Sequence, residues 1–157
     1  MDIHHGSCDL IKAHLIIPAR RYHIENPPVP SGQVFHFTTD SGLLYEVRFG
    51  RKTDNYFGHV VNFGVKSDEF DNEYSTTNKG ELFIIIPTVI EIICRYQHQH
   101  PRNNYYEFTG EFKESHESQE SSIRSRFYLR IAKRYINSEI WSTELHNNKV
   151  IIRKINN

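Results

Sequence analysis

The sequence has few of the residues that mark specialised protein classes. Its 157 residues include two cysteines and one methionine, and 19 Lys and Arg residues balance 19 Asp and Glu residues. A neutral total charge excludes the strong positive field expected of a protein that coats DNA, although a local basic surface is compatible with it. The glycine-rich phosphate loop, the Cys-x-x-Cys pair and the nucleophile elbow are all absent from the sequence. These absences leave catalysis with little support.

The cysteines and the apolar runs argue against secretion and membrane insertion. Cys8 lies in a polar stretch and Cys94 in an apolar run, and the N-terminus shows no basic segment followed by an apolar one. We expect both cysteines to be reduced thiols and a disulfide to be absent. The longest apolar run, residues 82–86, is too short to span a bilayer. We therefore expect a soluble cytoplasmic protein with no membrane partner.

The length and the order of the elements favour one α+β domain over residues 1–157. A Pro-rich connector at residues 26–32 follows an N-terminal segment, in which residues 10–17 are predicted as a strand. The later strands come in consecutive runs and do not alternate with helices. We therefore predict a largely antiparallel sheet with two helices packed on one face.

Alternating apolar residues predict most of the strands. Residues 82–86 are predicted as a further buried strand, and Pro87 is placed in the first turn of a helix that ends near His98. A second helix is predicted through residues 122–136. The other predicted strands are residues 34–39, 43–49, 57–65, 105–112, 142–146 and 150–155, with turns at residues 40–42 and 147–149.

The second helix carries a row of basic residues. Arg126, Arg130 and Arg134 recur at every fourth position, and a helical wheel places Lys133 on the same polar arc. We name these four residues the basic edge. Like charges at this spacing repel one another, and no acid within the row relieves them. We predict a non-catalytic binding or accessory protein whose basic edge engages an acidic protein surface or nucleic acid, while a merely solvated edge stays an open alternative.

Arg124 breaks the pattern of this helix because it falls on the apolar side. A guanidinium in that position needs a carboxylate or several carbonyl partners. We expect either a structural ion pair with Glu107 or Glu111, or a place in the same anion or partner site.

Short motifs in residues 43–155 resemble a family of small uncharacterised bacterial and phage proteins. The features are a meander, a helix opening at Thr88-Val89, a strand carrying Phe108-Thr-Gly110, and a helix carrying Arg124-Ser-Arg-Phe-Tyr128. The family is a domain of unknown function, so the resemblance implies no activity. It does imply that Gly110, Arg124, Arg126 and Tyr128 are positions of interest, and Tyr128 joins the predicted partner site on this ground.

Two other functions stay open. His36-Phe-Thr38 and His116-Glu-Ser118 resemble the paired motif of two-histidine phosphoesterases, in which two imidazoles hold one phosphate. Chance matches of this kind are expected in a chain with ten histidines. The third possibility is a structural homo-oligomer that buries exposed aromatic residues at a symmetric interface, with Tyr56, Phe70 and Tyr74 as candidates.

No metal site or cofactor is predicted. His98 and His100 lie near a helix end, and Asp68, Asp71 and Glu73 lie in an acidic segment, but neither spacing matches a known site. We expect the two histidines to contact unsatisfied carbonyls at the helix C-terminus, and the acids to form a solvated loop.

Overall fold

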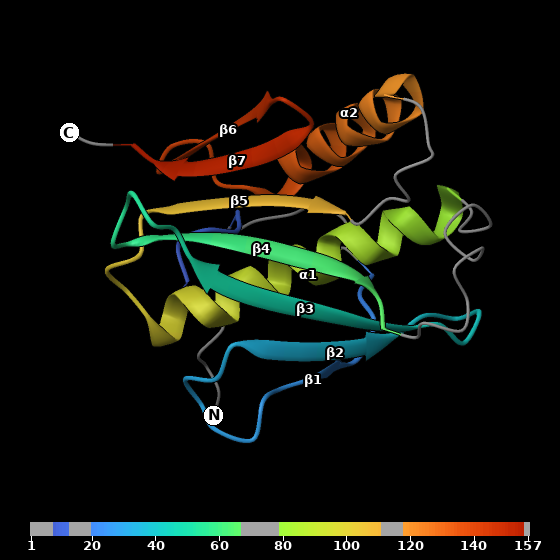
Figure 1. Ribbon diagram of the computed structural model, residues 1–157, viewed down its shortest axis with the longest axis horizontal. Coiled ribbons are helices and arrows are strands. Elements are labelled where there is room, and N and C mark those ends of the chain that lie inside the picture. Colours follow the sequence, from blue (N-terminus) through green and yellow to red (C-terminus); the bar gives the residue numbers. More distant parts are fainter. Residues whose placement is uncertain (1–7, 13–19, 67–78, 111–117, 156–157) are drawn as a thin grey trace.

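A computed structural model describes residues 8–12, 20–66, 79–110 and 118–155. Within these residues the chain forms one seven-stranded sheet and two α-helices, which confirms the predicted α+β class (Figure 1). The helices are α1 (Lys79–Gln99) and α2 (Ser118–Tyr135). The strands are β1 (Ile24–Glu25), β2 (Val34–Thr38), β3 (Leu44–Arg51), β4 (Gly58–Val65), β5 (Tyr105–Gly110), β6 (Trp141–His146) and β7 (Lys149–Lys154).

The sheet is antiparallel except at one junction. Its strand order is β1-β2-β3-β4-β5-β7-β6, and only β4 and β5 run parallel. α1 connects these two strands, because a parallel pair requires a crossover. β2 to β4 form the predicted meander, β1 adds a short edge strand that we did not predict, and β6 and β7 form the predicted closing hairpin. Asn147 and Asn148 join that hairpin with φ angles of 50° and 66°, as a type I′ turn requires.

Both helices pack on the same face of the sheet, as predicted. Phe49 of β3 stacks on Tyr96 of α1 with ring centroids 3.9 Å apart, and Phe63 of β4 lies 5.8 Å from Tyr128 of α2. Phe49 pairs with Val61, two residues before Phe63, so Phe49 and Phe63 project to the same side. Figure 1 views the sheet from its other side, with α1 behind β3 and β4. We call that other side the open face.

α1 differs from the sequence prediction. Residues 82–86, predicted as a strand, lie in its first half, and Pro87 is an interior residue instead of a first-turn residue. The hydroxyl of Thr88 donates to the carbonyl of Ile84 at 2.7 Å and accepts from the amide of Tyr22 at 3.0 Å. Burial of α1 against the sheet outweighs the strand preference of its β-branched run and the hydrogen bond lost at proline. In the described part of the chain, neither helix is long and apolar enough to cross a membrane.

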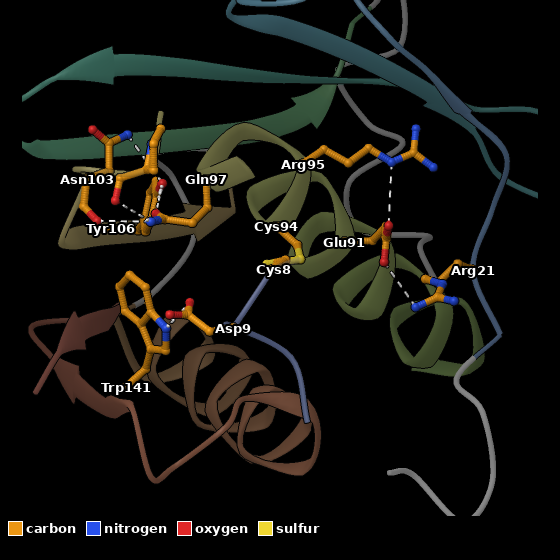
Figure 2. Close-up of a disulfide and its surroundings, with 11 residues drawn as sticks. Cys8, Asp9, Arg21, Glu91, Cys94, Arg95, Gln97, Asn103, Tyr106 and Trp141 are labelled. Carbon is orange, nitrogen blue, oxygen red and sulfur yellow. Dashed lines mark hydrogen bonds and ion pairs between the residues drawn. A yellow bond between two sulfur atoms is a disulfide. The ribbon is translucent and has the colours of Figure 1, made fainter. Parts of the chain in front are cut away.

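The C-terminal end of α1 is tied to β5 by a buried polar network (Figure 2). The hydroxyl of Tyr106 donates to the side-chain oxygen of Gln97 at 2.6 Å and accepts from the side chain of Asn103 at 3.3 Å. The side-chain amide of Gln97 also donates to the carbonyl of Asn103 at 3.2 Å. Because each of these buried groups has a partner, the network stabilises the helix end instead of offering a binding site.

A disulfide joins the N-terminal residues to α1. Cys8 and Cys94 are bonded, with Cα atoms 5.8 Å apart, so the prediction of two free thiols is wrong (Figure 2). The two cysteines are separated by 86 positions in the sequence, and only the packing of residues 8–12 against α1 brings them together. Nothing in the local context of either cysteine indicates that pairing.

Residues 8–12, which we call the strap, also hold α2 and β6. The carbonyl of Leu10 accepts from the amide of Asn137 at 2.8 Å, and Leu10 itself is fully buried. Ile11 forms an isolated antiparallel bridge with Ile136. The sequence predicts a strand over residues 10–17, but residues 13–19 lie outside the described part of the chain. Within the described residues of that range, the structure shows this one bridge. The strap therefore fixes the C-terminal end of α2.

Removing the disulfide should destabilise the protein. The Cys8→Ser/Cys94→Ser variant should lose about 3 kcal/mol of unfolding free energy, because the crosslink restrains the unfolded chain. Urea denaturation of the oxidised protein and the variant measures the loss. A reductant should bring the wild type to the stability of the variant and leave the variant unchanged. Equal stability of the variant and the oxidised wild type would contradict the prediction.

Candidate functional site

The basic edge lies on the solvent side of α2. Its four residues are all exposed, whereas Tyr128, Ile131 and Ala132 are buried on the opposite side of the helix. This separation follows from the 3.6-residue period, which collects the apolar side chains toward the sheet. The exposed residues are Arg126, Arg130, Lys133 and Arg134. The positive charge that the sequence predicts on one side of the helix is therefore on the surface.

Three cations of the basic edge have no acidic partner within the described part of the chain. No Asp or Glu described by the structure forms an ion pair with Arg130, Lys133 or Arg134. Lys133 and Arg134 also lie in the last turn of α2, where the partial negative charge of the helix end stabilises a cation. The surface at this end of α2 is thus positively charged and held in place by the helix.

The sequence prediction also places Tyr128 and Arg124 in the partner site. The structure separates Tyr128 from the basic edge and does not describe the side chain of Arg124. Tyr128 is 3% exposed and lies in the core beside Phe63, so its ring faces away from the basic edge. The side chain of Arg124 lies outside the described part of the structure. Glu107, one of the two acids considered as its partner, lies on the open face with other partners. Glu111 lies outside the described residues, and Gly110 is the last residue of β5.

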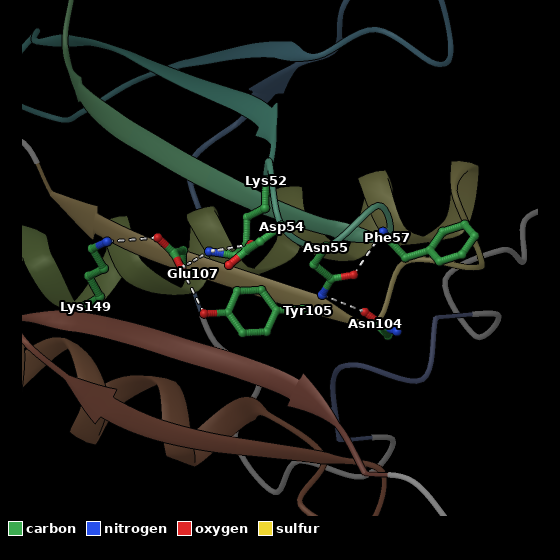
Figure 3. A network of polar contacts seen from close by, with 8 residues as sticks. All are labelled: Lys52, Asp54, Asn55, Phe57, Asn104, Tyr105, Glu107 and Lys149. Carbon is green, nitrogen blue, oxygen red and sulfur yellow. Dashed lines mark hydrogen bonds and ion pairs between the residues drawn. The ribbon is translucent and has the colours of Figure 1, made fainter.

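A second charged cluster, which we did not predict, lies on the open face (Figure 3). Glu107 of β5 is 5% exposed. Its carboxylate accepts hydrogen bonds from Lys52 at 3.2 Å, Lys149 at 3.0 Å and the hydroxyl of Tyr105 at 2.8 Å. The alternation along β5 indicates that Glu107 points outward, but the two lysines come from distant parts of the chain. Only the sheet order brings them to one carboxylate.

The pKa shifts in this cluster favour an ionised Glu107 and protonated Lys52 and Tyr105. Burial raises the pKa of Glu107, but hydrogen bonds from Lys149, Tyr105 and Lys52 outweigh burial and hold the pKa below its ordinary value. Burial lowers the pKa of Lys52, but its bond to Glu107 outweighs this and raises it. Burial and the bond to Glu107 raise the pKa of Tyr105. A carboxylate with three donors is a weak base, so the cluster ties strands together and is poorly suited to general base catalysis.

Glu107→Ala should destabilise the fold by about 2 kcal/mol at neutral pH, because it leaves two lysines facing each other without their acceptor. The lowered folded pKa means that the stabilisation is present above about pH 4.3 and is lost as the pH falls through the folded pKa. Denaturation at pH 7 and at pH 3 measures both effects. Glu144→Ala, which removes an exposed ion pair with Arg153, is the matched control and should cost under about 0.5 kcal/mol. Equal losses in the two variants would refute the structural role.

His59 is a core residue. It is 4% exposed, and its ring lies 5.2 Å from that of Tyr96 and 6.2 Å from that of Tyr106. Its Nδ1 atom has no hydrogen-bond partner among the described residues. Burial, together with the charges of His100 and Arg51, lowers the pKa of His59 to about 4. The ring is therefore neutral at physiological pH and contributes apolar packing.

This histidine should make the protein sensitive to acid. Below about pH 6.5 the unfolded chain binds a proton at His59, whereas the folded chain does so only near pH 4. Stability should thus fall between these values by as much as about 3 kcal/mol from this residue alone. The difference in unfolding free energy between wild type and His59→Phe, measured across pH 4 to 7, isolates the effect. His23→Phe, which removes an imidazole at an exposed position, is the matched control. A pH-independent difference for His59→Phe would disprove the assignment.

The two-histidine alternative depends on residues that the structure does not describe together. His36 lies on the open face in β2, where Glu25 and Glu46 are its cross-strand neighbours. His116 lies outside the described residues, so the structure does not test whether the two histidines share a site, and the two-histidine phosphoesterase stays an untested alternative. For the oligomer alternative, Tyr56 is 65% exposed, while Phe70 and Tyr74 lie outside the described residues.

The histidines at the end of α1 follow the prediction in part. Nδ1 of His100 lies 3.0 Å from the carbonyl of Tyr96, one of the last carbonyls of the helix. His98 is the penultimate residue of α1. Asp68, Asp71 and Glu73 lie outside the described residues. Within the described ranges, no group of three or more His, Cys, Asp or Glu side chains is arranged to hold a metal ion.

Comparison with known proteins adds no relative. No family model, no curated protein and no solved structure matches this chain. The resemblance of residues 43–155 to a family of uncharacterised proteins therefore carries no further argument. Any functional proposal must rest on the surfaces themselves.

Proposed function

We propose that this protein is a non-catalytic binding protein that engages an acidic protein surface through the basic edge of α2. The supporting observation is the set of exposed neighbouring cations, Arg130, Lys133 and Arg134, that have no ion-pair partner among the described residues. Elsewhere in the described structure, basic residues such as Lys52 and Arg21 pair with acids of the same chain. Arg130, Lys133 and Arg134 differ from these in lying together on one helix, so they offer another molecule a concentrated positive charge.

Electrostatics favours an anionic partner at this edge. Arg130 and Arg134 lie four residues apart on one helix, a spacing at which like charges destabilise a helix by a few tenths of a kcal/mol. Carboxylates of a partner would relieve that repulsion. Guanidinium groups also bind carboxylates with two parallel hydrogen bonds, which adds geometric selectivity to the attraction.

The scaffold holds the edge in place before binding. The hydroxyl of Ser125 in α2 donates to the carbonyl of Asn148 at 3.1 Å, which ties the helix to the β6–β7 turn. At the C-terminal end of α2, the amide of Lys12 in the strap donates to the carbonyl of Tyr135 at 2.8 Å. A rigid backbone lowers the entropic cost of association. The cations therefore form a pre-arranged surface.

The total charge favours a protein partner over long nucleic acid. The chain carries 19 basic and 19 acidic residues, and a neutral protein lacks the broad field that drives binding to a polyphosphate. A row of four cations on one helix matches a compact acidic patch better than an extended duplex. We therefore place the acidic protein first and nucleic acid second.

Charge reversal tests the proposal. Arg130→Glu/Arg134→Glu should weaken binding to fluorescently labelled poly-L-glutamate at low salt by more than about tenfold, measured by anisotropy. The thermal stability of this variant should stay within about 1 kcal/mol of wild type, because the positions are exposed. The matched control is Lys66→Glu/Arg102→Glu, which changes the total charge equally at two exposed residues outside α2. Equal weakening in both variants, or no binding by wild type, would show that the basic edge is not the site.

A further inference from the structure

An aromatic pair lies where α1 meets α2. The rings of Phe83 in α1 and Phe127 in α2 contact edge to face, with centroids 5.0 Å apart and an interplanar angle of 81°. Phe127 is half-buried, but Phe83 is 45% exposed, although most of α1 is deeply buried. The pair is thus an apolar surface that the fold leaves partly uncovered.

This aromatic pair borders the basic edge. Phe127 lies three residues before Arg130 and seven before Arg134, spacings that place side chains on neighbouring rows of one helix. Phe83 packs against Phe127 from α1 and widens the apolar area on that flank. The surface therefore combines the guanidinium groups of Arg130 and Arg134 and the half-buried ring of Phe127 in α2 with the exposed ring of Phe83 in α1.

We propose that the partner is an acidic polypeptide segment that places an apolar side chain on Phe83 and Phe127 while its carboxylates engage Arg130 and Arg134. This inference rests on the proposed function and specifies its partner. Two observations indicate this kind of partner. Arg130 and Arg134 have no acidic partner among the described residues, so carboxylates would complement their charge. The exposed ring beside them would contact an apolar side chain. Aromatic residues beside arginine are also the composition that binding centres favour.

The arrangement fits a polypeptide better than single-stranded nucleic acid. Proteins that bind single strands stack successive bases on several aromatic faces along a basic groove. Here Phe83 is the more exposed ring, and Phe127 meets it edge to face, so the two rings do not form a series of stacking faces. A polypeptide that carries one apolar side chain between acidic residues needs only one contact with an exposed ring.

Two synthetic polymers distinguish the contribution of apolar contact to the binding affinity from the contribution of charge. Wild type should bind a random copolymer of glutamate and tyrosine roughly tenfold more tightly than poly-L-glutamate of equal length, measured by anisotropy. Phe83→Ser should remove this preference and leave the affinity for poly-L-glutamate unchanged. Phe83→Leu should keep part of the preference, because leucine retains apolar area. Tyr56→Ser, which removes another exposed aromatic residue, is the control and should bind both polymers as wild type does.

The outcomes separate this inference from the proposed function. If Arg130→Glu/Arg134→Glu loses both polymers but Phe83→Ser keeps the preference for the copolymer, the aromatic inference is overturned and the proposed function stands. If wild type binds neither polymer, both fail. If an oligothymidylate binds more tightly than the copolymer and Phe83→Ser weakens it, the partner is a single-stranded nucleic acid and the inference is overturned.

Discussion

The burial of α1 against one face of the sheet is the interaction on which the rest of the structure depends. α1 carries the chain from β4 to the parallel strand β5, so the central strands exist as neighbours only if this helix crosses over them. Ile85, Val89 and Ile93 recur along its buried side and are removed from solvent. Burial of such side chains is worth about 2 kcal/mol each, which outweighs the cost of an interior proline.

The strap and α2 complete the cover that α1 begins, and this determines which surface of α2 faces outward. Tyr128 and Ile131 lie inward because the sheet offers aromatic partners such as Phe63. The opposite side of the helix then has nothing apolar to bury and carries the cations. The disulfide between Cys8 and α1 strengthens this cover. Because Cys8 and Cys94 are bonded, the two cysteines no longer indicate a reducing compartment.

Charged residues play two different parts in this fold. Around Glu107, two lysines and a tyrosine hydroxyl satisfy one carboxylate, and the cluster is complete without a ligand. At the basic edge, the described structure supplies no carboxylate to Arg130 or Arg134. A carboxylate that already has three donors gains little from another molecule, whereas Arg130 and Arg134, which have no ion-pair partner among the described residues, gain an attraction when a partner supplies carboxylates. This contrast is why the proposed function rests on α2 and not on the open face.

The sequence by itself determined the features that depend on local periodicity. Alternation predicts the strands from Val34 onward, the Asn147-Asn148 turn predicts the closing hairpin, and the helical period separates the basic edge of α2 from its core side. Tertiary structure alone decided the non-local features, namely the helical state of residues 82–86, the pairing of Cys8 with Cys94, and the cluster at Glu107. A short apolar run with proline suits a strand or a helix equally, and burial against the sheet selects the helix. Disulfide and ion-pair partners that lie tens of residues apart are brought together by the packing of the sheet and helices, so no local pattern encodes them.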